Sequence, residues 1–224
     1  MTIAVGANRN HAGTQSLLNT FTRTMVDNFT EAAVPVQLEN HVADTGQTWA
    51  SLSDANDNLQ INPSGTVERD ASGAASDIIG YKSDTGDLVN RISIKMRNTG
   101  TPSKAAPANA GVVWRDAYMR AIISGSASLQ CSIFEYIAGW QNRAVTTSSI
   151  GVPADANNWG VAIVTEANGR TVLDCTSWAS DLYCSWGSIS SLFPADQHVG
   201  LYVENGVNNI ANAQFRELKT FASL

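Results

Sequence analysis

The stretch RISIKM, residues 91–96, decides the fold class because its apolar side chains recur at every second position. Successive side chains of a β-strand point to opposite faces, so Ile92, Ile94 and Met96 share one face and the polar residues share the other. This alternation is typical of an antiparallel sheet with one face in a core and the other in water. We therefore expect residues 91–96 to form a half-buried strand.

The same period of two recurs further along the chain. It places Trp159, Val161 and Ile163 on one face, and over residues 199–203 it puts the aliphatic side chains on one face and Tyr202 on the other. In both stretches we expect the apolar set to face a core and the alternate set to face water.

Short strands and turn residues account for most of the sequence after residue 27. The dipeptide Asn168-Gly169 predicts a hairpin turn, and no stretch has a long helical period. Ten or more short strands without the spacing of βαβ units predict an all-β fold, an antiparallel two-sheet sandwich. Further strands are expected at residues 111–114, 118–123, 129–137 and 171–175.

The composition fits one domain with a core that needs neither disulfides nor metals. The chain has 224 residues, of which 43% are hydrophobic and 15% charged. Its net charge of −6 argues against a nucleic-acid partner, because an acidic surface repels phosphates. The apolar runs are too short to span a membrane, and the first residues do not resemble a signal peptide, so we expect synthesis in a cytoplasm.

Residues 1–26 are polar and rich in Asn and Thr, with a short apolar patch at Leu17, Leu18 and Phe21. We expect an extended N-terminal arm here, followed by the sandwich at residues 27–224. A loose terminus and an assembly segment that docks on a neighbouring subunit are both compatible with this composition.

The stretch DNFT at residues 27–30, followed by LENHVADTGQTW at residues 38–49, resembles the opening of concanavalin A-like lectin and glucanase domains. The resemblance is to jelly-roll domains of the kind found in bacteriophage structural proteins. It continues at VGLYV, residues 199–203, and AQFREL, residues 213–218, which are similar to the family's last strands. It implies a jelly-roll sandwich over roughly residues 27–221.

Two details within this resemblance concern local structure. The piece Asp44-Thr45-Gly46 predicts a turn, with Trp49 covering the edge of the sandwich. Phe215 and Leu218 are three positions apart, so either a β-bulge or a helical turn is needed to bring both to one face.

No catalytic constellation is present in the sequence, so we expect no enzyme activity. The hydrolases of this superfamily carry acidic residues at alternate positions of one strand, whereas the seven glutamates here are widely separated. His11, His41 and His198 have no partner at the spacing of a metal site or a triad. We expect each histidine to be an ordinary polar residue of the surface or of a loop.

Metal and disulfide candidates are sparse. Oxygen atoms of Asp54, Asn56 and Asp57 could bind Ca²⁺, although such clusters also form plain turns, and no other cofactor is indicated. The cysteines Cys131, Cys175 and Cys184 are expected to be buried thiols. If a disulfide forms, Cys175 with Cys184 is the expected pair.

The segment from residue 178 to residue 186 is the candidate binding loop, because it gathers Trp178, Asp181, Tyr183 and Trp186 among polar residues. Exposed aromatic rings stack on sugars and a carboxylate accepts hydrogen bonds from their hydroxyls. The same rings could instead fill the core or a subunit contact.

Two functions remain open from these observations. The first is a non-enzymatic bacteriophage virion protein, a head decoration or tail component assembled in the host cytoplasm and bound to other virion proteins and to copies of itself. The alternative is a lectin-like module that recognises a glycan on the host surface. The two functions can coexist in one protein.

Overall fold

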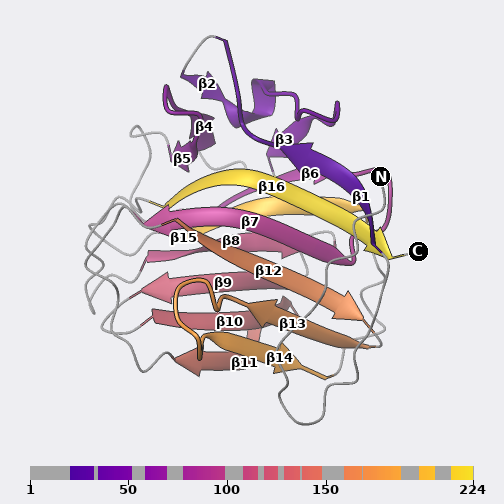
Figure 1. The fold of residues 1–224 in the computed structure, drawn as a ribbon, viewed down its shortest axis with the longest axis vertical. Coiled ribbons are helices and arrows are strands. Elements are labelled where there is room, and N and C mark those ends of the chain that lie inside the picture. Colours follow the sequence, from indigo (N-terminus) through magenta and orange to yellow (C-terminus); the bar gives the residue numbers. More distant parts are fainter. Residues whose placement is uncertain are drawn as a thin grey trace.

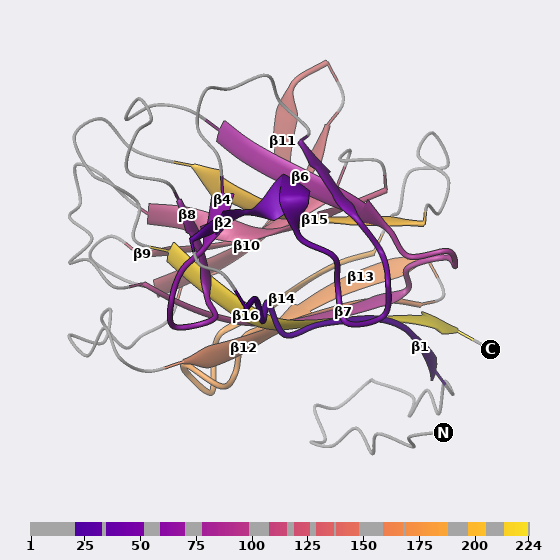
Figure 2. The same ribbon diagram turned by 90° about the horizontal axis from the view of Figure 1, so that it is seen from above.

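The chain forms a sandwich of two antiparallel sheets packed face to face, as Figures 1 and 2 show for this computed structural model. The all-β prediction is confirmed. The structure describes residues 21–32, 35–51, 59–69, 78–98, 108–115, 119–125, 129–136, 138–147, 159–167, 169–187, 197–204 and 213–223.

Sixteen strands and one short 3-10 helix are formed by the described residues. They are β1 (Phe21–Asp27), β2 (Val36–Gln37), the helix η1 (Leu38–Asn40), β3 (Trp49–Ser51), β4 (Leu59–Ile61), β5 (Val67–Arg69), β6 (Ile78–Asp84), β7 (Arg91–Asn98), β8 (Ala108–Trp114), β9 (Met119–Gly125), β10 (Leu129–Tyr136), β11 (Trp140–Thr147), β12 (Gly160–Ala167), β13 (Arg170–Asp174), β14 (Tyr183–Trp186), β15 (His198–Glu204) and β16 (Ala213–Ser223).

The two sheets differ in size and in strand order. The nine-stranded sheet runs β14-β13-β12-β7-β16-β5-β4-β2, with β1 also pairing with β16. The seven-stranded sheet runs β11-β10-β9-β8-β15-β6-β3. Strands that are distant in sequence therefore meet at the centre of each sheet, as β7 and β16 do in one and β8 and β15 in the other.

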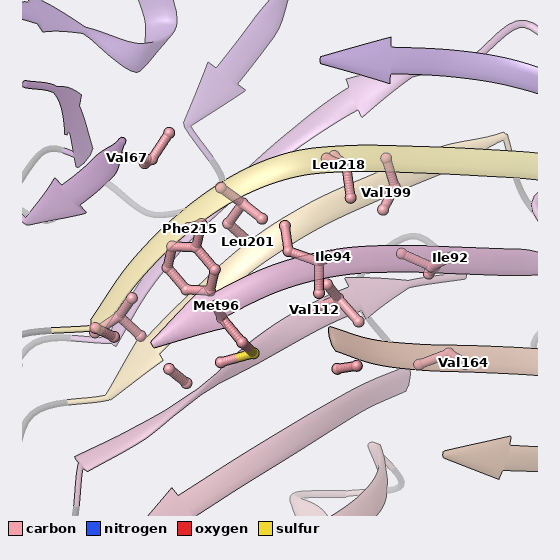
Figure 3. Close-up of a cluster of buried hydrophobic side chains, with 14 of the residues drawn as sticks. Val67, Ile92, Ile94, Met96, Val112, Val164, Val199, Leu201, Phe215 and Leu218 are labelled. Carbon is pink, nitrogen blue, oxygen red and sulfur yellow. The ribbon is translucent and has the colours of Figure 1, made fainter. Parts of the chain in front are cut away.

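The core lies between the sheets and confirms the period-two reading of β7 and β15. Ile92, Ile94 and Met96 of β7 are buried and face the aliphatic side chains of residues 199–203 (Figure 3). Each such side chain contributes about 1.5–3 kcal/mol when it leaves water. Tyr202 points to the other side of β15, as expected. It is only 2% exposed, so the outer side of this sheet is not fully exposed to solvent at this position.

The expected orientation of β12 is wrong. Trp159, Val161 and Ile163 are half-buried on the outer side, and Ala162 and Val164 face the core. On the core side of this strand, the indole of Trp178 lies against Gly160, where an added Cβ would be 1.7 Å from a ring atom. Alternation alone could not decide which of two partly apolar faces is buried.

Strand β16 contains a β-bulge between Phe215 and Leu218. The spacing of these two residues left a β-bulge and a helical turn as alternatives. The pairing with β7 changes register between Arg216 and Lys219, and Glu217 has a φ of 54°. Phe215 and Leu218 consequently both reach the core and are fully buried.

The first described residues belong to the sandwich. Strand β1 pairs with β16 from Phe21 opposite Ser223 to Asp27 opposite Leu218, and Met25 is fully buried. The expected boundary after residue 26 therefore falls inside a strand. Sequence composition suggested an arm because most side chains of this strand before Met25 are polar. The expected contact residues Leu17 and Leu18 lie outside the described residues.

Candidate functional site

The outer side of the seven-stranded sheet carries a group of aromatic side chains. Cys131 and Ile133 of β10 face the core, so the alternate residues Phe134 and Tyr136 face outward. Trp140 of β11 is paired directly with Tyr136 and shares its side of the sheet. We call this outer side, with Phe134, Tyr136, Trp140 and Tyr202, the aromatic face.

Burial varies across the aromatic face. Tyr202 and Val113 are buried and form an apolar cluster with Phe134 that is separate from the core between the sheets. Val113 lies over Gly200 of the neighbouring strand, where an added Cβ would come within 2.5 Å of its side chain. Tyr136, in contrast, is 41% exposed. The face therefore has a packed inner part and an accessible end.

The accessible end is formed by a pair of rings in the hairpin that joins β10 to β11. The ring centroids of Tyr136 and Trp140 are 5.4 Å apart and the rings meet edge to face. Gly139, in the turn, has a φ of 123°, a conformation that L-residues rarely adopt. The tight turn thus fixes the two rings side by side.

Neutral polar groups accompany these rings. Gln130 and Thr147, paired across β10 and β11, share a hydrogen bond of 2.9 Å from the Gln130 amide nitrogen to the Thr147 hydroxyl. Asn142 is paired with Phe134, and Ser132 lies on the same side of β10. Rings together with amides and hydroxyls can contact a hydroxyl-rich ligand.

The predicted binding loop is divided between the core and the surface. Trp178 covers Gly160, and Trp186 packs against the core with the Arg143 guanidinium 5.6 Å from its ring centroid. Tyr183 is 41% exposed, and Asp181 is half-buried. The two tryptophans therefore follow the packing alternative, and the four residues do not form one exposed surface.

The turn at residues 44–46 has the structural role that its sequence predicts. The Asp44 carboxylate accepts hydrogen bonds from the backbone and side-chain nitrogens of Asn28, at 3.0 and 2.6 Å. The Thr45 hydroxyl accepts one from the backbone of Val26. Gly46 has a φ of 96°. The turn thereby holds the end of β1.

A buried histidine lies beside this turn, contrary to the expectation of surface polarity. His41 is 1% exposed, and its Nε2 is 2.8 Å from Oδ1 of the fully buried Asp27. Its Nδ1 bonds to Glu31, and the indole nitrogen of Trp49 donates to the other oxygen of Asp27 at 2.8 Å. We call Asp27, Glu31, His41 and Trp49 the histidine cluster.

The charge state of this cluster follows from its partners. Burial alone lowers the pKa of His41, but the hydrogen bonds to Asp27 and Glu31 together with their charges raise it above its ordinary value. A protonated imidazole donates from both nitrogens to the two carboxylates. Asp27 and His41 are both buried, and their hydrogen bond ties the end of β1 to the segment that precedes β3.

A second buried ionic group joins the two sheets. Glu166 of β12 accepts a hydrogen bond of 2.6 Å from the Trp114 indole nitrogen and bonds of 2.7 and 2.9 Å from the Arg115 guanidinium. All three residues are buried. We call Trp114, Arg115 and Glu166 the arginine cluster.

The remaining candidates concern metal ions and membranes. The expected Ca²⁺ ligands Asp54, Asn56 and Asp57 lie outside the described residues. Within the part of the chain that the structure describes, no three His, Cys, Asp or Glu side chains are grouped to hold a metal. In that same part, no helix has the length and apolarity needed to cross a bilayer.

The three cysteines come together in the core. Cys131, Cys175 and Cys184 are all buried and all free, so the expected pair Cys175 and Cys184 is not bonded in this structure. Their expected burial is confirmed.

Comparison with known proteins identifies the architecture. No protein-family profile matches the sequence, and no curated protein sequence matches it significantly. Solved structures do match. The non-specific endo-β-1,3(4)-glucanase SCLam aligns over 91% of this chain and 92% of its own, with a TM-score of 0.55 and 8% identity. The chain has a concanavalin A-like jelly-roll fold.

Two further matches with this fold are proteins of other kinds. The CBM2 module of the evolved Dit protein of Lactobacillus casei BL23 phage J-1 aligns over 91% of this chain and 96% of its own, with a TM-score of 0.56 and 9% identity. The exoplasmic domain of VIP36, in a form bound to Ca²⁺ and Man2, aligns over 90% and 88%, with a TM-score of 0.55 and 9% identity. At these identities the matches establish the fold alone.

Proposed function

We propose that the protein is a lectin-like carbohydrate-binding module and that the aromatic face holds the sugar. The observation that carries this proposal is the presence of Phe134, Tyr136, Trp140 and Tyr202 on one outer side of one sheet. The similarity in fold to a phage CBM2 module and to a Man2-bound domain supports it.

The chemistry of the accessible end suits a sugar ring. Tyr136 and Trp140 offer apolar ring surface for the C–H faces of a pyranose, and Asn142 beside them offers an amide for its hydroxyls. The buried Tyr202 and Val113 hold the floor of the face rigid, which lowers the entropy lost when a ligand binds.

Titration of immobilised glycans and calorimetry with the glycans that bind provide the test. We expect Tyr136→Ala to weaken binding at least ~10-fold, in the range of a lost stacking contact. Tyr183→Ala is the matched control, because Tyr183 is also 41% exposed but lies on β14 of the other sheet. Circular dichroism checks that both variants fold.

The outcomes separate the two candidate surfaces. Loss of binding in Tyr183→Ala with normal binding in Tyr136→Ala would move the site to the loop at residues 178–186. Failure of the wild-type chain to bind any glycan would refute a lectin-like function.

Two finer expectations stay predictions. One is that the protein has no hydrolytic activity, which incubation of the bound glycans with the purified chain would test. The other is a place in a bacteriophage virion, supported by the similarity to the phage J-1 module. Electron microscopy of purified particles labelled with an antibody against this chain would test that location, its virion partners and its assembly with copies of itself.

A further inference from the structure

The three cysteines lie at one place between the sheets although they come from three segments. Cys131 is on β10 of the seven-stranded sheet, Cys184 is on β14 of the nine-stranded sheet, and Cys175 directly follows β13. All three belong to the same buried core cluster. Strand β10 contacts both β13 and β14 at this point.

Cys131 occupies the central position in this group. Its thiol makes side-chain hydrogen bonds with both Cys175 and Cys184. Cys175 and Cys184 each form a hydrogen bond with Cys131. Cys131 is therefore the thiol that interacts with both of the others.

The backbone register explains why Cys175 and Cys184 do not meet. Cys184 is paired with Leu173, and the backbone nitrogen of Cys175 bonds to the carbonyl oxygen of Leu182. Cys175 and Cys184 are thus diagonal neighbours on two adjacent strands. Diagonal neighbours have Cα atoms about 7–8 Å apart, beyond the usual span of a disulfide.

We propose that these cysteines form an oxidisable site in which Cys131 makes a disulfide between the two sheets, with either Cys175 or Cys184 as its partner. The oxidant is a low-molecular-weight disulfide, RSSR. The Cys131 thiolate attacks one sulfur of RSSR and releases RS⁻, which takes up a proton, and a mixed disulfide forms. The second protein thiol then loses its proton and attacks the Cys131 sulfur, which releases the second RSH.

The environment of the thiols favours this order of attack. In the folded chain, hydrogen bonds from Cys175 and Cys184 lower the pKa of Cys131, which favours Cys131 as the attacking thiol when the group becomes accessible. Because all three sulfurs are buried, the first step takes place during folding or local opening. The site is independent of the proposed sugar-binding function and would close in an oxidising compartment.

The test refolds the full-length chain from denaturant in a mixture of oxidised and reduced glutathione. Free thiols are then alkylated and the peptides are mapped by mass spectrometry. We expect one alkylated cysteine of the three and a disulfide that contains Cys131. We also expect the thermal midpoint to rise by about 5–10 °C, because the bond closes a long loop.

Serine variants identify the central residue. Cys175→Ser and Cys184→Ser should each still form one disulfide with Cys131, whereas Cys131→Ser should form none. Oxidation in denaturant is the control, since the unfolded chain should favour the short loop between Cys175 and Cys184. If Cys131→Ser fails to fold, the map of the wild-type chain alone decides.

Two results would overturn the proposal. One is a native chain that keeps three free thiols after refolding in the glutathione mixture. The other is a native disulfide between Cys175 and Cys184 that leaves Cys131 free.

Discussion

The histidine cluster and the arginine cluster both bury carboxylates among nitrogen donors, but their cations differ. In the first, His41 lies between Asp27 and Glu31, where β1 leads into the loop before β3. In the second, Arg115 donates to Glu166 between β8 and β12. An imidazole loses its charge near neutral pH, whereas a guanidinium keeps its charge. The difference teaches that the kind of cation matters, and we expect the stability contributed by the histidine cluster to depend on pH.

The largest effect is expected from Glu166→Gln. This change preserves the size of the side chain but removes the buried carboxylate that accepts from Trp114 and Arg115. The free energy of unfolding should fall by about 3–5 kcal/mol, as for other buried pairs that lose one partner. Urea unfolding at pH 6 and pH 9 measures it, and the loss should be equal at both. A loss below about 1 kcal/mol would show that the cluster is not a stabilising pair.

A smaller and pH-dependent effect is expected from His41→Gln. The folded pKa of His41 is raised, so its charged hydrogen bonds contribute fully below its ordinary pKa of about 6.5 and are lost as the pH rises through the folded value. The variant should therefore be less stable than the wild type by roughly 1–3 kcal/mol at pH 6, and the difference should shrink toward pH 9.

The same urea titrations check this prediction. Glu166→Gln serves as the control, because its stability should follow the pH dependence of the wild type. A difference between His41→Gln and the wild type that stays constant from pH 6 to pH 9 would contradict the assignment of a charged His41.

The smallest loss of stability is expected at an exposed ion pair. This pair shows how little such an interaction contributes when it is not buried. Lys95 and Glu217 lie on the outer side of the nine-stranded sheet with 2.6 Å between nitrogen and oxygen, and both are partly exposed. Lys95→Ala should cost less than about 1 kcal/mol, and added salt should reduce the difference from the wild type further. A loss as large as that of Glu166→Gln would mean that burial does not determine how much an ion pair contributes to the free energy of unfolding.

The strands could be predicted because their apolar residues follow the geometry of a strand. Residues 91–96 and 199–203 each have one clearly apolar set, so period and burial agree. In β12 both sets are partly apolar. The set of Trp159, Val161 and Ile163 faces outward, and on the opposite side Trp178 fills the space over Gly160. Packing against other segments determines which of two such faces is buried, and the sequence of the strand alone does not show those contacts.

The site was harder to predict than the fold. The aromatic face combines residues of β10, β11 and β15, and only the pairing of strands brings them together. One signal was available, because Phe134 and Tyr136 alternate with the core residue Ile133. His41 was misread because its partners Asp27 and Glu31 lie at no familiar motif spacing and meet it only in the fold.

The pairing of β1 with β16 has a consequence for how this sandwich can be built into larger proteins. Phe21 lies opposite Ser223, so the first and last described residues of the sandwich are neighbours, about 5 Å apart as in any strand pair. A surface loop of a host protein can therefore carry the whole module as an insertion without being stretched. By the same geometry, a short linker between these two ends would allow circular permutants opened at other loops.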